Sequence, residues 1–348
     1  MNKVLLGLSG GIDSAAAASL LKEQGFQVTG CFLLLTPDSD ENSEEAKSAR
    51  ALAEHLGIDF ITADYRERFK KNVSEYFISE YLSGKTPNPC VRCNPTVKIR
   101  SLIDEAQKAG ADFVATGHYA KAQYSEKHGG VVIKAAASKK DQSYFLSGLS
   151  ADMPEKLIFP LGDFSSKEEI REYAMLRGFP NAQKADSQEI CFIPEGDYQS
   201  YIRKHTSSVC SPGSFLDNEG KIIGTHTGII NYTVGQRKGL GAFGEPRYVK
   251  FINARDNTVT LCKKDERFSS RVVAEGLSLA VKNHPGEKFE ALVKIRSTAA
   301  AVKAQVELRE SLVYIDFSEK VLAPSPGQTA ALYDGDIIIG SAVILSAE

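Results

Sequence analysis

Six residues near the start of the chain, Ser9-Gly10-Gly11-Ile12-Asp13-Ser14, form the first group of side chains that could do chemistry. They follow the apolar residues 4–6 and precede the alanine-rich residues 15–21, so the expected order is strand, glycine-rich turn, helix. Such a turn directs backbone N–H groups and a helix N-terminus at one point, which makes a phosphate site. Asp13 stands where a Walker loop has lysine, and an acid there suits a nucleotide whose pyrophosphate leaves with a metal ion.

This turn resembles the pyrophosphatase loop (PP-loop) of ATP-dependent adenylating enzymes. These include tRNA sulfur-transfer enzymes, tRNA lysidine synthetase, argininosuccinate synthase and ammonia-using nucleotide synthetases. The alternative is a buried strand–turn–helix with small residues for packing, but two glycines, an aspartate and two serines in six residues exceed what packing requires. Two other glycine-containing segments fail on context: Ser79 replaces the first Walker glycine before Gly84-Lys85-Thr86, and Pro246 follows residues 239–244 where a dinucleotide site needs a helix.

Cys90 and Cys93 lie in a proline-rich segment, residues 86–95, and its three prolines predict a stiff, extended loop before a helix. A zinc site would need further ligands at matched spacing, and the chain has no second Cys-x-x-Cys. A thioredoxin-like pair would need a helix start after a strand, which the prolines make awkward. A reactive thiol fits better, because a helix N-terminus and nearby Arg92 or Lys98 would lower its pKa. Small buried cysteines remain the alternative for one of the two.

Cys191 lies between Ile190 and Phe192, and these apolar neighbours alone predict a buried core thiol. Asp186 and Glu189 would also disfavour a thiolate there. The three remaining cysteines have no supporting chemistry nearby and are predicted to be structural: Cys31, Cys210 and Cys262.

The bulk composition limits the class of protein. A chain of 348 residues predicts two or three domains, and 42% hydrophobic with 25% charged residues is typical of a soluble globular protein. We expect no membrane association and a cytoplasmic location, because the sequence has no long apolar run and no signal peptide. Six cysteines are too few for a disulfide framework. A net charge of −2 argues against a generally basic nucleic-acid surface but permits local clusters of lysine and arginine.

The first half of the chain alternates helix and strand patterns. This alternation predicts an α/β fold with a doubly wound parallel sheet, which binds ligands at the carboxyl ends of its strands. The loops after Leu6 and Thr116 are therefore expected side by side over one nucleotide. The predicted strands cover residues 28–35, 58–62 and 112–117, and the predicted helices cover residues 14–24, 44–57, 65–82 and 96–109.

The pattern changes after about residue 205, where turns become frequent and apolar and polar residues alternate. Residues 289–296 and 302–308 show this period of two, which predicts an antiparallel sheet or barrel. We predict three domains: residues 1–205 bind ATP and catalyse, residues 206–275 form a small β-rich domain that contacts tRNA, and residues 276–348 form a C-terminal β-barrel.

Seven blocks in this order resemble the tRNA-specific 2-thiouridylases (the MnmA family) over essentially the whole chain. One block alone would be weak evidence, whereas seven in order make a chance match very unlikely. The blocks are the glycine-rich turn, Thr86-Pro87-Asn88-Pro89 with Cys93-Asn94, residues 115–120, residues 139–146, residues 186–193, residues 232–241 and residues 323–328.

The resemblance implies an enzyme that uses ATP to replace the O2 oxygen of the wobble uridine, position 34 of tRNA, with sulfur. Adenylation of O2 would release pyrophosphate, and sulfur transfer from a cysteine persulfide would release AMP. By motif, Cys93 is the nucleophile and Cys191 carries the persulfide. The implied partners are tRNA and a sulfur donor, either a cysteine desulfurase or a sulfur-relay carrier; the implied cofactors are ATP and Mg²⁺, the latter held by Asp13.

The resemblance also implies the remaining site residues. ATP contacts are expected from Gly7, Leu8, Ser9, Gly10, Gly11, Ile12, Asp13, Ser14, Leu33 and Gly117. Contacts to the target base are expected from Asn88, Pro89 and Cys90. Contacts to the rest of the tRNA are expected from His118, Lys140, Asp141, Gln142, Arg296, Ser297 and Gln328.

Three positions depart from common family members. Many carry aspartate where Cys90 stands, an arginine–tyrosine pair where Arg296-Ser297 stands, and methionine where Leu33 stands. Two alternative functions stay open. One is a lysidine synthetase, which would adenylate tRNA but would need no cysteine pair. The other is a non-catalytic RNA-binding module, which would have no use for an ATP loop.

Overall fold

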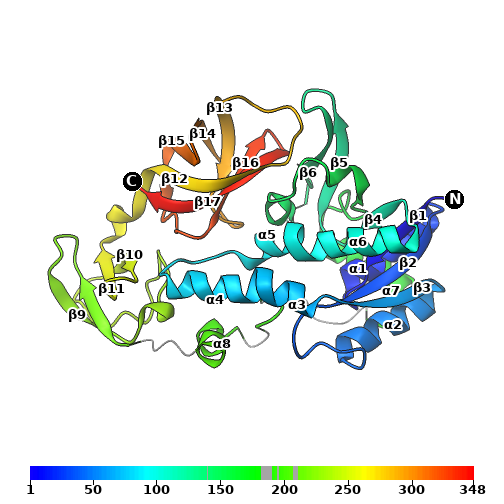
Figure 1. Cartoon of the computed structure of the whole chain (residues 1–348), viewed down its shortest axis with the longest axis horizontal. Coiled ribbons are helices and arrows are strands. Elements are labelled where there is room, and N and C mark those ends of the chain that lie inside the picture. Colours follow the sequence, from blue (N-terminus) through cyan, green and yellow to red (C-terminus); the bar gives the residue numbers. More distant parts are fainter. Residues whose placement is uncertain (139, 182–189, 194–195, 207–210) are drawn as a thin grey trace.

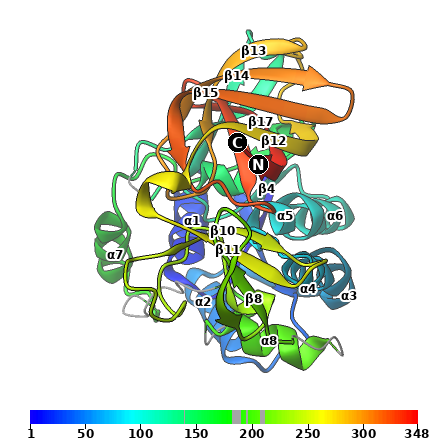
Figure 2. The same ribbon diagram turned by 90° about the vertical axis from the view of Figure 1, so that its left-hand side faces the viewer.

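The computed structural model describes residues 1–138, 140–181, 190–193, 196–206 and 211–348. Three parts follow the chain from the N-terminal α/β domain through a small β-rich region to a C-terminal barrel (Figure 1). In the view along the long axis, the barrel lies at the top and helices α2 and α8 lie toward the bottom (Figure 2). No helix in the described ranges is both long and apolar enough to cross a membrane.

A five-stranded sheet forms the centre of the N-terminal domain, and all of its pairings are parallel. Its spatial order is β3 (Asp59–Asp64), β2 (Gln27–Leu34), β1 (Lys3–Gly7), β4 (Phe113–Ala115) and β7 (Leu157–Ile158). Leu6 pairs with Gly30 on one side and with Ala115 on the other, so the loops after β1, β2 and β4 leave the sheet at the same edge. This confirms the predicted α/β fold and places its ligand edge.

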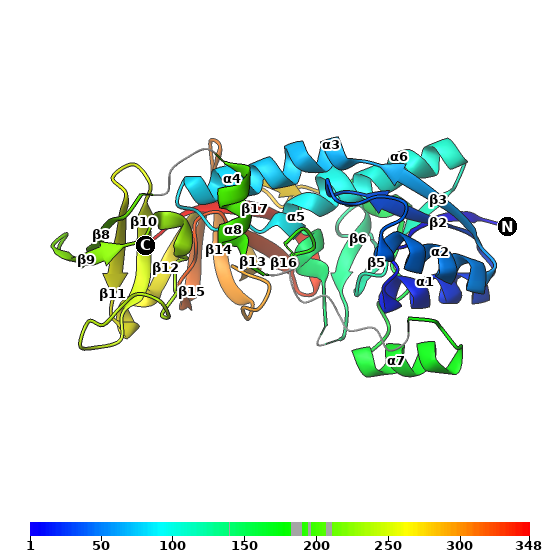
Figure 3. The same ribbon diagram turned by 90° about the horizontal axis from the view of Figure 1, so that it is seen from below.

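Helices cover both faces of this sheet (Figure 3). One face packs against α1 (Ile12–Glu23), α2 (Glu44–Leu56) and α7 (Lys167–Leu176), and the other packs against α6 (Ile99–Ala109). Successive strand residues supply the two cores, since Leu6 faces the first group and Leu5 the second. Helix α2 begins where predicted, because the Ser43 side chain accepts a hydrogen bond from the Ala46 N–H.

The proline-rich segment is helical, and the predicted extended loop before a helix was wrong. After α3 (Arg66–Phe69), the π turn η1 (Lys70–Ser74) and α4 (Glu75–Leu82), a second helical stretch starts at Pro89. It runs through α5 (Pro89–Cys93) and the π turn η2 (Asn94–Lys98) directly into α6. Asn88 caps this stretch, and Pro89 occupies the first helical position, where its missing N–H costs nothing.

Alternating strands form the C-terminal barrel, as the period of two predicted. Its strands are β12 (Phe268–Leu279), β13 (Lys288–Lys294), β14 (Val302–Arg309), β15 (Leu312–Leu322), β16 (Thr329–Asp334) and β17 (Ile337–Ala347). Antiparallel pairing between β12 and β17 closes the sheet. A hairpin from the first half of the chain, β5 (Ala120–Ser125) and β6 (Gly130–Ala135), joins the same sheet beside β17.

The small region between these parts follows α8 (Tyr198–His205). It holds the sheet β10 (Tyr248–Asn253), β11 (Thr258–Cys262), β8 (Gly213–Leu216), β9 (Ile222–His226), in that spatial order. Short 3₁₀ turns are η3 (Ser143–Leu146), η4 (Pro154–Lys156), η5 (Ile229–Asn231) and η6 (Lys264–Arg267). The proposed division at 205 falls at the end of α8, and the division at 275 falls inside β12; the three-domain division itself stays a prediction.

A turn of the barrel holds the segment that leads into α5. The Thr86 N–H donates to the Pro326 carbonyl at 2.8 Å, and the Gln328 side-chain amide donates to the Thr86 carbonyl at 2.8 Å. Gly327, with φ of +87°, lies so close to Lys85 and Thr86 that a Cβ there would approach their atoms to about 3.0 Å. The start of α5 is therefore fixed by residues at the far end of the chain.

Candidate active site

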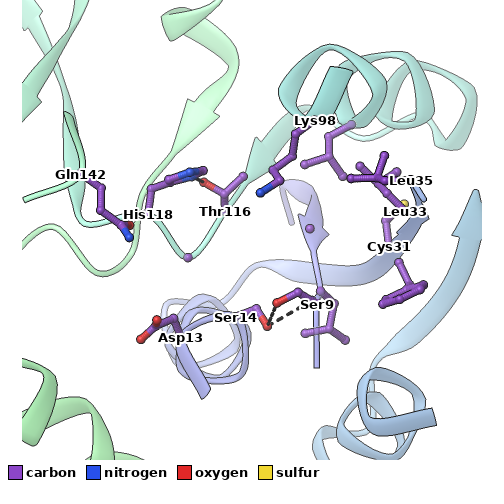
Figure 4. Close-up of a pocket in the computed structure, with 15 residues that line it drawn as sticks. Ser9, Asp13, Ser14, Cys31, Leu33, Leu35, Lys98, Thr116, His118 and Gln142 are labelled. Carbon is purple, nitrogen blue, oxygen red and sulfur yellow. Dashed lines mark hydrogen bonds between the residues drawn. The ribbon is translucent and has the colours of Figure 1, made fainter. Parts of the chain in front are cut away.

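A cavity of about 250 Å³ opens at the carboxyl ends of β1, β2 and β4 (Figure 4). The loop after β1 forms one wall, the end of β2 a second, and the loop after β4 together with Lys98 a third. Its lining residues are Gly7, Leu8, Ser9, Asp13, Ser14, Cys31, Phe32, Leu33, Leu35, Lys98, Leu102, Thr116, Gly117, His118 and Gln142. The expected pairing of the loops after β1 and β4 over one pocket is thus confirmed.

Hydrogen bonds within the loop after β1 fix its shape. The Ser14 hydroxyl donates to the Gly11 carbonyl at 2.9 Å and accepts from the Ser9 N–H at 3.2 Å. Gly10 has a φ of +74°, and a Cβ there would lie 2.7 Å from the Glu45 carbonyl oxygen, so only glycine fits. Ile12 is buried beneath the loop. The loop is therefore a preformed turn at the N-terminus of α1, the geometry that binds phosphate.

Gly117 lets the two loops approach each other. A Cβ at this position would lie 3.0 Å from both the Asp13 carbonyl carbon and the Ser14 nitrogen. These are backbone atoms and cannot swing aside, so a larger residue would separate the loops. Of the ten residues expected to contact ATP, all except Gly10, Gly11 and Ile12 line the cavity, and those three shape the loop instead.

Asp13 makes two contacts that the sequence did not reveal. Its carboxylate accepts from the Tyr119 hydroxyl at 2.8 Å and from the Lys167 ammonium at 2.6 Å. Lys167 is the first residue of α7, directly after the N-cap Ser166, and is itself buried. In the described part of the chain, no group of three or more histidine, cysteine, aspartate or glutamate side chains could hold a metal ion. A Mg²⁺ ion at Asp13 would therefore depend mainly on phosphate oxygens of a nucleotide.

His118 and Gln142, expected to contact tRNA, line the cavity. Burial, reinforced by the charge of Lys98, lowers the pKa of His118 to about 3, so its imidazole is neutral at physiological pH. Its Nδ1 lies 2.7 Å from the Thr116 hydroxyl. The Gln142 side chain accepts from the Tyr119 N–H at 3.0 Å. Both side chains therefore belong to the wall that faces the glycine-rich loop (Figure 4).

Cys93 is buried at the end of α5, just before the π turn. Burial raises the pKa of its thiol to about 12, whereas the Lys98 ammonium and the Lys98 backbone N–H act to lower it. Burial likewise raises the pKa of Cys90, also against the effect of Lys98. The prediction that a helix N-terminus and a neighbouring cation would lower the pKa of such a thiol was wrong, because burial has the larger effect on the pKa of both cysteines.

Cys191 is exposed, so the prediction of a buried thiol from its apolar neighbours was also wrong. Phe192 occupies the core position instead, and its ring contacts Phe69 at 5.3 Å, Phe77 at 5.5 Å and Tyr201 at 5.3 Å between centroids. Cys191 nevertheless lies close enough to Cys93 to act on its pKa through charge. Cys31 and Cys262 are buried, and Cys31 also lines the cavity. Asp186, Glu189 and Cys210 lie outside the described residues.

The other residues expected to contact the target base or tRNA fall into two groups. Some hold local structure: Asn88 caps α5, Pro89 is buried, Asp141 accepts from two backbone N–H groups, Arg296 donates to the Ala323 carbonyl at 3.3 Å, and Gln328 binds Thr86. Lys140 is exposed, and Ser297 is half-buried. The contacts of these residues with RNA stay predictions.

Comparisons with known proteins identify first the class of domain and then the family. Residues 2–195 match the model described as tRNA methyl transferase HUP domain, residues 199–263 the tRNA methyl transferase PRC-barrel domain, and residues 269–344 the aminomethyltransferase beta-barrel domain. The chain is thus a HUP-domain protein with two β-rich regions after it.

The relatives identify the family. The tRNA-specific 2-thiouridylase MnmA of Clostridioides difficile (strain 630) is 40% identical over 353 residues, which covers 98% of both chains. The protein of the same name from Acetivibrio thermocellus is 39% identical over 98% of this chain and 99% of its own, and MnmA 2 of Clostridium botulinum (strain Loch Maree) is 42% identical over 98% of both. The chain belongs to the MnmA family of tRNA-specific 2-thiouridylases.

Proposed function

We propose that this protein is an ATP-dependent tRNA sulfurtransferase that forms 2-thiouridine at the wobble position. The observation that carries the proposal is the position of Lys98, which lines the nucleotide cavity and acts through its charge on Cys90, Cys93 and Cys191. The reaction needs a binding site for a nucleotide and a pair of thiols, and Lys98 lies near both. The names of the relatives support the same substrate and product.

In the first step, the uracil O2 attacks the α-phosphorus of ATP, and pyrophosphate leaves. The product holds AMP on O2, which converts an oxygen that cannot leave into a good leaving group. The preformed loop of residues 9–14 and the N-terminus of α1 would bind the phosphates, while Leu33 and Gly117 would border the adenosine. Asp13 would contribute one ligand to Mg²⁺, which neutralises developing phosphate charge when it is bound.

In the second step, sulfur replaces the activated oxygen at C2, and AMP leaves. The sulfur comes from a persulfide on Cys191, whose exposure suits it to receive sulfur from a donor protein. Cys93 attacks the Cys191 sulfur, either first, which releases sulfide for addition to C2, or after the terminal sulfur has bonded to C2. Both routes end with a disulfide between Cys93 and Cys191, which an external thiol must reduce before the next turnover.

The target uridine must leave the anticodon stack to reach this site. The α5 start, with Asn88, Pro89 and Cys90, would form the rim that receives the base. Because Asn88 caps the helix and Thr86 is held by Gln328, this rim is rigid before tRNA arrives.

The proposal is tested by mass analysis of wobble nucleosides from tRNA incubated with the protein, ATP and a persulfide donor. We expect 2-thiouridine together with one AMP and one pyrophosphate for each sulfur inserted. The same reaction without ATP serves as the control. Adenylation of tRNA without sulfur gain, insensitive to thiol alkylation, would indicate instead an enzyme of the lysidine synthetase kind.

A further inference from the structure

Lys98 occupies an unusual place for a cation. It is the only positively charged residue among the side chains that line the cavity, and its ammonium is turned toward the space between Thr116 and the glycine-rich loop (Figure 4). Within the described parts of the chain, no hydrogen bond or ion pair is made by this ammonium group. Lys98 is half-buried, and a cation in a cavity wall without an anionic partner favours the binding of a negatively charged group.

The π turn η2 brings Lys98 over Cys93. In a regular α-helix, two residues five positions apart point about 140° away from each other around the axis. In η2, the Ile99 N–H bonds to the Asn94 carbonyl, and this wider turn returns residue 98 to the side of the helix on which Cys93 lies.

Among the described groups near the Cys93 thiol, Lys98 is the one that supplies positive charge. Cys90 and Cys191 oppose its ionisation, and Lys98 favours it. Arg92 turns away, with its guanidinium 4.1 Å from the Tyr76 ring centroid, and the lysines of the neighbouring η1 are exposed. On the cavity side, Lys98 faces a neutral His118, while the Asp13 carboxylate is engaged by Lys167.

We propose that Lys98 is the positioning residue of the sulfur-transfer step, the cation that stabilises the Cys93 thiolate while its proton passes to solvent water. Its role is to raise the fraction of Cys93 that can attack the Cys191 persulfide, against the opposing effect of burial. The proposal rests on the proposed function only in taking Cys93 as the nucleophile.

The test is the rate at which iodoacetamide alkylates Cys93, followed residue by residue with peptide mass spectrometry from pH 6.5 to 9. No ATP or tRNA is added, so the result does not depend on thiolation, and the two proposals can fail separately. We expect Lys98→Met to slow alkylation of Cys93 about tenfold or more and to displace its rate profile by at least about one pH unit. Lys98→Arg should restore the rate to within about threefold of the natural chain.

Two controls separate a charge effect from loosened packing. Arg100→Met removes an exposed cation that pairs with Asp104 on the following turn, and it should leave the Cys93 profile unchanged. The remote buried Cys262 reports on the fold in every sample. If Lys98→Met destabilises the fold, Lys98→Gln is used instead, because glutamine keeps a long polar side chain without the charge.

The proposal is overturned if Cys93 alkylation in the folded Met or Gln variant equals that of the natural chain. It is equally overturned if these variants lose ATP affinity, measured by equilibrium binding of labelled ATP, while the Cys93 profile stays in place. In that case Lys98 would serve the nucleotide phosphates alone.

Discussion

The glycine-rich loop and the cysteine pair differ in how their parts are held. Within six residues, the loop closes on itself through the hydrogen bonds of Ser9 and Ser14, and the side chains of Ser48 and Asn181 hold it from outside by donating to the Gly10 carbonyl. Cys93 is buried on a helix, whereas Cys191 is exposed and is held by the neighbouring ring of Phe192. The difference fits the two proposed tasks: a site for phosphate works best preformed, whereas a sulfur carrier would have to meet a donor protein outside and a base inside.

The largest effect should come from removing either thiol of the pair. We expect Cys93→Ser and Cys191→Ser each to lower 2-thiouridine formation by at least about 10³-fold, because a hydroxyl cannot carry or resolve a persulfide. Binding of tRNA should be retained in both. Cys90→Ser is the matched control and should not abolish activity. Full activity of Cys191→Ser in a nucleoside mass assay would remove the persulfide role.

Asp13→Ala tests the role of the glycine-rich loop. This change removes the carboxylate that accepts hydrogen bonds from the Tyr119 hydroxyl and the Lys167 ammonium at the edge of the loop. We expect AMP formation from labelled ATP in the presence of tRNA to fall about 10²–10³-fold. Asp163→Ala, which alters an exposed ion pair with Lys121, is the control. Unchanged tRNA-dependent ATP consumption in Asp13→Ala would show that the loop has another task.

Alkylation of the natural chain sharpens the contrast between the two thiols. Burial raises the pKa of Cys93 to about 12, so its thiolate fraction should grow about tenfold for each unit from pH 7 to 9, without a plateau. Exposed Cys191 should react faster than Cys93 throughout this range. The measurement is site-resolved mass spectrometry of the modified peptides. A plateau for Cys93 below pH 9 would mean that desolvation does not control this thiol.

A smaller effect is expected where the loops after β1 and β4 meet. Gly117→Ala forces a Cβ against backbone atoms of Asp13 and Ser14, and we expect ATP binding to weaken by about 1–3 kcal/mol. In Gly224→Ala the added Cβ meets the Phe243 ring at 3.4 Å and the Phe215 ring at 3.6 Å, which are ordinary contacts with side chains far from the cavity, so affinity should not change. Equal ATP affinities by calorimetry would contradict the close approach of the two loops.

The smallest effect concerns the tether between the barrel and α5. Gln328→Ala removes one hydrogen bond to Thr86, which is worth about 1 kcal/mol. We expect faster amide hydrogen exchange in residues 86–93, with no change in the loop of residues 9–14. Identical exchange in the two proteins would show that Pro326 and Gly327 hold the segment without the glutamine.

The sequence predicted the features that depend on neighbouring residues and missed those that depend on residues far apart in the chain. The glycine-rich turn, the parallel sheet and the barrel strands follow from short-range patterns, and the structure confirms them. The helix in the proline-rich segment was missed because proline is common both at the first position of a helix and in loops. Only Asn88, a residue typical of helix N-caps, distinguishes the two cases. The exposure of Cys191 could not be predicted, because Ile190 and Phe192 show that one side is apolar without showing which residue enters the core. The pairing of Asp13 with Lys167 spans 154 residues and leaves no periodic trace.

The bond between Thr86 and Gln328 has a consequence for the order in which the protein is made. These residues are 242 positions apart, so at 5–20 residues per second a ribosome needs about 12–50 s to add the second after the first. The β5–β6 hairpin waits over a similar interval for β17, its partner in the barrel sheet. During translation the nucleotide loop can form early, but the helix that bears Cys93 lacks its anchor until the last strands emerge. A nascent chain can therefore form the loop proposed to bind phosphate well before the helix that bears Cys93 is fixed in place.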